Sequence, residues 1–209
     1  GESKMFAIAC LLIGYLMGSL MTAELAARLK TGRGMAAAGR GNPGMANAWA
    51  RLGPAWGVAV LAGDLAKTAA ACLVCEYVFF PELGMRAALY AGLGAVIGHD
   101  FPLYHGFRGG KGVAATAMMA LCVSPTLALL VYAGGAVAML LSRYLAVGSA
   151  TIAALLPLLA ALMGMGGEAT VLLALSGGLM LLRHAPNFRR MRQGQEQSFG
   201  LRRPSSLSR

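Results

Sequence analysis

The segment from Gly98 to Val113, which reads GHDFPLYHGFRGGKGV, holds the densest group of residues suited to binding an anion. Glycines let a backbone turn sharply and bring its N–H groups close to a ligand. Because an apolar run resumes at Val113, we expect GGKG to lead directly into the N-terminus of a helix. Free N–H groups, the positive end of the helix dipole and Lys111 would then converge on one phosphate. The alternative is a basic interfacial loop whose glycines serve close packing. The spacing is not that of a Walker A loop.

A second loop rich in glycine and asparagine covers residues 39–51 and reads GRGNPGMANAWAR. Asn47 and Arg51 are four residues apart, so they face the same way on a short helix. An arginine side chain offers a fork of donors that suits phosphate, and an asparagine amide can orient a hydroxyl group. The alternative is an interfacial helix whose arginine extends toward the surface.

Four further polar residues lie within or beside apolar runs. Asp64 and Lys67 are three residues apart and share a helix face, where ionisable groups are costly and usually line a functional cavity. Their alternative role is a neutralising pair that joins two helices, and we favour support of the cavity over direct catalysis. His184 ends the last apolar run and would either act in proton transfer or bond its neighbours. Ser149 lies just inside another run, where a serine usually bonds its own helix backbone.

The composition indicates an all-α integral membrane protein. Of the 209 residues, 57% are hydrophobic and 12% are charged, which is about half the charged fraction of a soluble domain. The net charge of +10 comes from short basic clusters between apolar runs. Such clusters are typical of the residues that flank membrane spans. We therefore expect contact with anionic membrane lipid and no nucleic-acid partner.

The four cysteines all lie in apolar runs. Cys72 and Cys75 form a CxxC pair that is open to a redox reading, but no βαβ pattern surrounds it. Packing thiols are the preferred interpretation. The sequence also lacks zinc-type spacing and an HExxH motif.

Hydropathy predicts one membrane domain, residues 1–209, with seven transmembrane helices. Because about 20 residues are needed to cross a bilayer, residues 113–123 span only about half of it. Non-helical backbone at such depth must be enclosed by protein or by a wet cavity. We therefore expect the glycine-rich cytoplasmic loops to be re-entrant or interfacial. The expected spans are 5–27, 54–80, 85–98, 113–123, 126–142, 145–163 and 169–183, followed by a basic tail, 184–209.

Charge predicts the orientation of these spans. Seven spans place alternate connections on opposite sides, and one side receives fifteen of the 18 lysines and arginines. By the positive-inside rule this side is cytoplasmic, which leaves the N-terminus outside. The other side holds Glu82, Arg86 and Glu168.

Five stretches taken together resemble one protein family. GHDFPLYHGFRGGKGVA resembles the second signature of the bacterial acyl-phosphate:glycerol-3-phosphate acyltransferase (PlsY) family, and GRGNPGMANAWARLGP resembles its first. SRYLAVGS resembles the third signature, HAPNFRRMRQGQE the basic ending, and DLAK a part of the second helix. The resemblance covers nearly the whole chain in the family's order.

The resemblance implies a seven-helix enzyme that transfers a fatty acyl group from acyl phosphate to the 1-hydroxyl of glycerol 3-phosphate. The products are lysophosphatidic acid and phosphate, and this is the first step of phospholipid synthesis. The resemblance also implies a place in the bacterial inner membrane, with no metal and no cofactor. An acyl phosphate has a good leaving group, so a covalent acyl-enzyme is not required. We expect a monomer, because one chain can enclose both phosphate pockets.

The residues implied for the site fall into three groups. Lys111, Ser149, His184 and Asn187 are expected to be catalytic. Asp64, Lys67 and Arg143 are expected to support the site. The residues expected to bind phosphate or substrate, with Lys111 among them, are Asn42, Asn47, Arg51, His99, Gly109, Gly110 and Gly112.

The chain departs from the family pattern chiefly on the acceptor side, at Ala36, Arg40, Pro43 and Ala146. Two alternatives follow. One is an acyltransferase of the same fold with a different polyol-phosphate acceptor, and the other is a non-enzymatic membrane transporter of anions.

Overall fold

The computed structural model describes residues 1–35 and 42–198, and the regular structure in these ranges is helical. Short π and 3-10 turns connect some of the α-helices, at Cys75–Phe79, Pro81–Leu83 and Leu103–His105. The α-helices of the described ranges are α1 (Glu2–Gly18), α2 (Thr22–Thr31), α3 (Met45–Leu52), α4 (Pro54–Val74), α5 (Met85–Asp100), α6 (Val113–Val123), α7 (Pro125–Ser142), α8 (Leu145–Leu162) and α9 (Gly167–Arg192).

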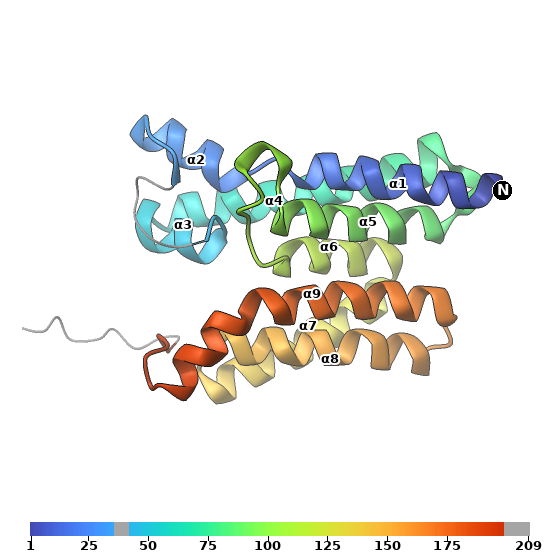
Figure 1. Ribbon diagram of the computed structural model, residues 1–209. Coiled ribbons are helices and arrows are strands. Elements are labelled where there is room, and N and C mark those ends of the chain that lie inside the picture. Colours follow the sequence, from blue (N-terminus) through green and yellow to red (C-terminus); the bar gives the residue numbers. More distant parts are fainter. Residues whose placement is uncertain (36–41, 199–209) are drawn as a thin grey trace, which may run out of the picture.

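The long helices form a bundle in which α1, α4, α5 and α6 lie on one side and α7, α8 and α9 on the other (Figure 1). Within the described residues, five segments are long and apolar enough to cross a membrane: 2–31, 54–79, 125–142, 145–162 and 167–192. α5 and α6 are shorter, and α6 has the bounds that the sequence predicts. The largest buried apolar cluster joins α5 and α6 to α7, α8 and α9.

α1 and α5 pack closely because glycines face backbone on both helices. A Cβ atom added to Gly14 would lie 2.0 Å from the Ala91 carbonyl oxygen, and one added to Gly94 would lie 2.1 Å from that of Leu11. Small residues at this spacing are typical of helix pairs in membranes. α1 is thereby fixed along its length to α5, the helix that ends at the Gly98–Val113 loop.

The first apolar run is interrupted, which differs from the single span expected over 5–27. α1 ends at Gly18, and Met21 has an extended backbone before α2 begins. Two hydrogen bonds join the break to neighbouring segments. Lys67 Nζ donates to the Leu20 carbonyl oxygen at 2.7 Å, and Ser19 Oγ accepts from the backbone N–H of Leu103 at 3.3 Å. Polar partners inside the protein make such a break tolerable at membrane depth.

α9 continues beyond the expected end of the last span. The hydropathy pattern ends near residue 183, but the helix runs to Arg192 and includes Pro186. Proline removes one backbone hydrogen bond, and α9 bends in its C-terminal part (Figure 1). The start of the expected tail is therefore helical. Hydropathy missed this part because it detects only the apolar part of a helix.

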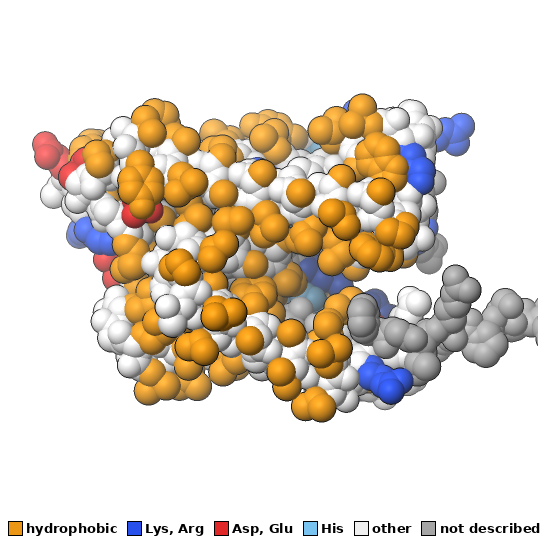
Figure 2. Space-filling view, turned by 180° about the vertical axis from the view of Figure 1, so that it is seen from behind, with side chains coloured by type: hydrophobic (Ala, Val, Ile, Leu, Met, Phe, Trp, Pro, Cys, Tyr) orange, Lys and Arg blue, Asp and Glu red, His pale blue; other side chains and the backbone are white. Residues whose placement is uncertain are grey.

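The three helices α1, α5 and α9 begin at the same end of the molecule. Arg86 at the start of α5 forms an ion pair with Glu168 of α9, with 2.8 Å between Nε and Oε2. Arg86 also donates to Ser3 Oγ near the start of α1, at 2.9 Å. Apolar side chains are spread across the face shown in Figure 2.

Candidate active site

The glycine-rich turn before α6 folds back onto the end of α5. The N–H of Gly110 donates to the His99 carbonyl oxygen at 2.9 Å, and the N–H of Gly109 donates to that of Asp100 at 3.2 Å. A Cβ atom at Gly109 would lie 2.0 Å from the His99 oxygen, and one at Gly110 would lie 2.0 Å from His99 Nε2. The structure therefore differs from the prediction that these two N–H groups bind phosphate, because the turn uses them to attach to α5.

Gly112 and Lys111 stand at the N-terminus of α6, as the sequence predicts. Gly112 has a φ of 71°, in the left-handed region that favours glycine, and α6 begins at the next residue. The first N–H groups of a helix have no acceptor within the helix. Together with the helix dipole, they and the charge of Lys111 favour an anion at this point. The buried carboxylate of Asp100 opposes that preference, because a Cβ atom added to Gly112 would lie 3.1 Å from Asp100 Oδ1.

Lys111 reaches from this site to α9. Its Nζ donates to Asn187 Oδ1 at 2.7 Å, and the side chain is half-buried. Burial lowers the pKa of Lys111 below its ordinary value. The Glu196 carboxylate opposes this shift, whereas the Arg190 and Arg183 cations reinforce it. The ammonium group is therefore held close to α9 in partial isolation from water.

His184 and Asn187 are three residues apart and lie on one face of α9, and both are buried. His184 Nδ1 is 2.8 Å from the Met180 carbonyl oxygen. A carbonyl oxygen only accepts, so Nδ1 carries the proton, and in the neutral ring Nε2 is the acceptor. The structure thus joins two of the residues predicted to be catalytic, Lys111 and Asn187, and places His184 on the same helix face.

Two residues that sequence reasoning did not assign to the site contact these groups. Glu196 accepts from Asn187 Nδ2 and from Arg190 Nε, each at 2.6 Å. Arg183 donates through Nε to the Gly110 carbonyl oxygen at 2.9 Å and through Nη2 to that of Gly109 at 2.8 Å. Glu196 is the single acidic residue after Glu168, and this isolated position in a basic segment is the sequence feature that could have indicated its role. Arg183 is one of the fifteen basic residues from which the charge pattern predicts the cytoplasmic side.

The pair predicted in the other loop lies on α3. Arg51 Nε donates to Asn47 Oδ1 at 2.8 Å, so the two side chains face the same way as predicted. Asn47 Nδ2 is buried and has no hydrogen-bond partner among the described residues. Asn42 and Pro43 lie just before this helix, and Asn42 is half-exposed. The departures at Ala36 and Arg40 lie outside the described residues.

The residues of the third signature make local hydrogen bonds. Ser149 Oγ donates to the Leu145 carbonyl oxygen of its own helix at 3.1 Å, although the serine is buried. Arg143 is exposed and ends α7 with a φ of 63°, while its N–H donates to the Met139 carbonyl oxygen. Ser149 thus bonds within its own helix, and the backbone of Arg143 bonds at the end of α7. Ala146 is buried nearby.

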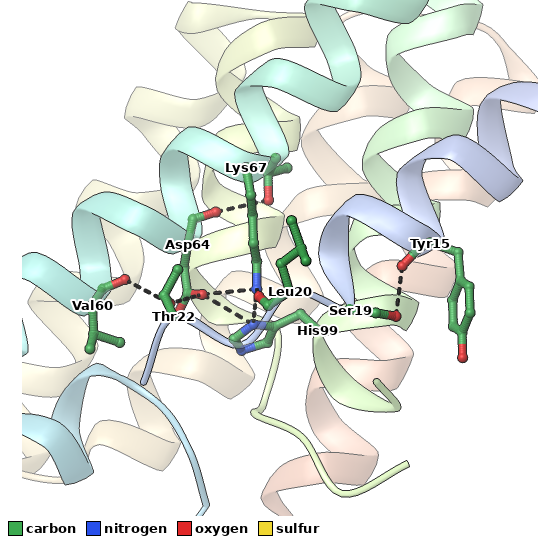
Figure 3. A network of polar contacts seen from close by, with 9 residues as sticks. Tyr15, Ser19, Leu20, Thr22, Val60, Asp64, Lys67 and His99 are labelled. Carbon is green, nitrogen blue, oxygen red and sulfur yellow. Dashed lines mark hydrogen bonds and ion pairs between the residues drawn. The ribbon is translucent and has the colours of Figure 1, made fainter. Parts of the chain in front are cut away.

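Behind the glycine-rich turn, Asp64, Lys67 and His99 form a buried polar network (Figure 3). Lys67 Nζ lies 2.9 Å from Asp64 Oδ1, 2.7 Å from the Leu20 carbonyl oxygen and 3.1 Å from His99 Nδ1. These three acceptors match the three donors of an ammonium group. Thr22 Oγ1 adds a hydrogen bond to Asp64 Oδ1 at 2.6 Å.

His99 does not have the position expected of a phosphate ligand. The imidazole is 4% exposed and lies between Lys67 on one side and Gly110 on the other. It is enclosed because the turn closes over it. The prediction that His99 binds substrate thus differs from the structure. His99 belongs instead to the buried polar network that packs beneath the glycine-rich turn.

The two phosphate-binding candidates, α3 and the α6–α9 site, lie at the same end of the bundle (Figure 1). Figure 2 shows a hollow at this end, with lysine or arginine and histidine side chains gathered in it. In the described ranges, no group of three or more His, Cys, Asp or Glu side chains is arranged to hold a metal ion. The cysteines there are free, and three of the four are buried.

Comparison with known proteins gives one consistent result. A family model described as glycerol-3-phosphate acyltransferase matches residues 8–194. A glycerol-3-phosphate acyltransferase of Desulforudis audaxviator is 35% identical over 203 residues, which cover 95% of this chain and 100% of the relative. One of Pseudomonas aeruginosa is 38% identical over 189 residues, which cover 90% and 97%.

The fold is similar to a crystal structure of PlsY (YgiH), an integral membrane glycerol 3-phosphate acyltransferase, in its glycerol 3-phosphate form. The TM-score is 0.82 at 30% identity, and 96% of each chain is covered. The form of the same protein with lysophosphatidic acid gives a TM-score of 0.80.

Proposed function

Because the chain belongs to the glycerol-3-phosphate acyltransferase family, we propose that it transfers a fatty acyl group from acyl phosphate to the 1-hydroxyl of glycerol 3-phosphate. The products are lysophosphatidic acid and phosphate. The observation that carries the assignment is the contact of Lys111 with Asn187 at the N-terminus of α6, on the helix face that also bears His184. This arrangement offers a cation, helix N–H groups and a proton acceptor to phosphorylated reactants.

The reaction needs no covalent enzyme intermediate. The hydroxyl oxygen of glycerol 3-phosphate attacks the carbonyl carbon of the acyl phosphate, and the bond from that carbon to the phosphate oxygen breaks. Lys111 and the first N–H groups of α6 stabilise the charge on the departing phosphate. The Nε2 atom of His184 accepts the hydroxyl proton. Asn187 positions Lys111, and holding both reactants in place supplies much of the rate.

The acceptor side is assigned to α3. The Arg51 guanidinium binds the phosphate of glycerol 3-phosphate, and the buried Nδ2 of Asn47 donates to an oxygen of the same substrate. Asn42 contributes from the adjoining loop. Ser149 uses its proton within α8, so its hydroxyl oxygen serves as an acceptor.

We further propose seven membrane passes, made by α1, α4, α5, α6, α7, α8 and α9, in a monomer of the bacterial inner membrane. The shared end of α1, α5 and α9 supports this count, since every second pass then begins on the same side. The basic segments are cytoplasmic by the positive-inside rule, and so is the site.

The decisive experiment measures lysophosphatidic acid and phosphate formed by the purified protein from an acyl phosphate and glycerol 3-phosphate. Lys111→Ala should lose activity about 100-fold or more, because it removes the main positive charge at the leaving group. Lys4→Ala is the matched control, since Lys4 is exposed at the start of α1. Equal product from Lys111→Ala and the native protein would contradict the proposal. A preference for another polyol phosphate in the same assay would favour the altered-acceptor alternative.

A further inference from the structure

Arg183 connects the helix that carries His184 and Asn187 to the turn that carries Lys111. It precedes His184 directly in α9. Its guanidinium donates to two successive carbonyl oxygens, those of Gly109 and Gly110, at 2.8 and 2.9 Å. The guanidinium carbon also lies 5.2 Å from the centre of the Phe101 ring, within the range of a cation–π contact.

These bonds complete the attachment of the turn. The N–H groups of Gly109 and Gly110 are bonded to the end of α5, and their carbonyl groups are bonded to Arg183. The peptide groups directly before Lys111 are thus fixed between two helices. Because the turn is fixed, the direction in which the Lys111 side chain leaves the backbone is also fixed. Its ammonium group donates to Asn187, which lies one turn of α9 beyond Arg183.

The contact requires the shape of arginine as well as its charge. Two carbonyl oxygens on successive residues are bonded by two different nitrogens, which the planar guanidinium presents in a fixed fork. A lysine has one nitrogen on a flexible stem and cannot reproduce that geometry. Because the guanidinium is directed at these two carbonyl oxygens, attraction of phosphate does not by itself explain its placement.

We infer that Arg183 is a positioning residue, which fixes the glycine-rich turn against α9 so that Lys111, His184 and Asn187 face one reacting phosphate. The inference rests on the proposed function for its catalytic consequence. Its structural part is that the Arg183 guanidinium fixes the geometry of the anion site at the start of α6. This part applies to any phosphate ligand.

The test compares Arg183→Lys and Arg183→Gln with the same two changes at Arg189, which is exposed on α9. Both Arg183 variants should lower kcat about 10- to 100-fold, because small displacements of catalytic groups have effects of this size. KM for glycerol 3-phosphate should change much less, since the proposed acceptor site lies on α3, whereas Arg183 is bonded to the turn before α6. Both Arg189 variants should match the native protein. An Arg183→Lys variant as active as Arg189→Lys would overturn the inference.

Two further measurements separate positioning from general loss of structure. Arg183→Ala should regain activity when guanidinium is added at millimolar concentration, and Arg189→Ala should show no such response. Binding of inorganic phosphate, read from its effect on Tm, should be about tenfold weaker in Arg183→Lys than in Arg189→Lys. Absence of rescue, or equal phosphate binding, would overturn the inference. A native protein that binds phosphate but forms no ester would contradict the proposed function alone, and the phosphate comparison would still test Arg183.

Discussion

At the scale of single residues, the proposed mechanism depends on a cation, Lys111, whose position is set by Asn187 before substrate binds. Asn187 accepts from Lys111 and donates to Glu196, so the orientation of its amide follows from its two partners. An amide held in this way presents only its oxygen to the ammonium group. Preorganised charge is effective in catalysis because it requires no rearrangement during the reaction.

The first prediction concerns pH. In the proposed mechanism Lys111 must be charged to stabilise the leaving phosphate. Burial lowers the pKa of Lys111, the Arg190 and Arg183 cations lower it further, and the Glu196 carboxylate opposes the shift. As the pH rises through this lowered pKa, the cation is lost. The pH–kcat profile of the native protein should therefore fall at alkaline pH, below the ordinary lysine value of about 10.4.

The control for this prediction is Lys111→Arg. Arginine stays charged throughout the accessible range, so any residual activity of the variant should not show the alkaline fall. The measurement is kcat from pH 6 to pH 10 at saturating substrates, with Tm followed in parallel. An alkaline limb of unchanged midpoint in the variant would show that another group titrates.

At the scale of elements, close helix contacts keep the loop-bearing helix in place. Gly94 of α5 faces the Leu11 backbone of α1, and Gly14 faces Ala91. Dispersion contacts between closely approaching backbones are an important part of helix association in lipid. The position of α5 in turn sets that of the Gly109–Gly112 turn, which is bonded to its end.

The second prediction is that Gly94→Ala weakens the α1–α5 pair. The added Cβ would lie 2.1 Å from the Leu11 carbonyl oxygen, so the helices must separate. Overpacking of this kind costs about 1–3 kcal/mol, which should lower Tm in detergent. Gly178→Ala in α9 is the matched control, because a Cβ there meets nothing within 4 Å. A control variant as unstable as Gly94→Ala would refute the packing account.

The third prediction concerns the ion pair of α4. Lys67→Met leaves Asp64 buried without its cation, and loss of one partner of a buried pair costs about 3–5 kcal/mol. The double variant Asp64→Asn, Lys67→Met should be more stable than the sum of the two single losses indicates. Unfolding by heat in detergent measures all three.

The exposed pair between Arg86 and Glu168 provides the control for this cycle, since its side chains are 41% and 40% exposed. Exposed pairs contribute little, so Arg86→Met should lower Tm far less than Lys67→Met. Strict additivity of the Asp64 and Lys67 variants would argue that the two charges do not interact.

At the scale of the whole molecule, the two ends of the bundle differ in chemistry. One end gathers the starts of α1, α5 and α9 around the Arg86–Glu168 pair. The other carries α3, the glycine-rich turn and the basic end of α9 (Figure 1). Basic residues on one side of a membrane protein indicate the cytoplasmic face.

The fourth prediction follows from this asymmetry. In cells, a cysteine introduced at Ser3 should react with a maleimide that cannot cross the membrane, and one at Gln193 should react only after the cells are opened. Cys122 is replaced by serine in both variants, because it is the half-exposed cysteine of the described chain. Labelling of Gln193→Cys in intact cells would contradict the predicted orientation, because it would place the end of α9 outside the cell.

The sequence alone determined features that depend on short stretches of chain. Hydropathy located the apolar helices, and GGKG followed by an apolar run gave the start of α6 at Val113. The spacing of Asn47 and Arg51 predicted their contact on one face of α3. These features are accessible because helix geometry relates residues three or four apart.

The tertiary structure alone decided which side chains meet and which backbone groups stay available. Lys111 and Asn187 are 76 residues apart, and no local periodicity relates them. The turn folds back onto α5 and so occupies the N–H groups of Gly109 and Gly110, encloses His99, and brings Arg183 to their carbonyl groups. The physical reason is that a hydrogen-bonding group takes the partner that packing places nearest, and packing between distant helices depends on the whole chain.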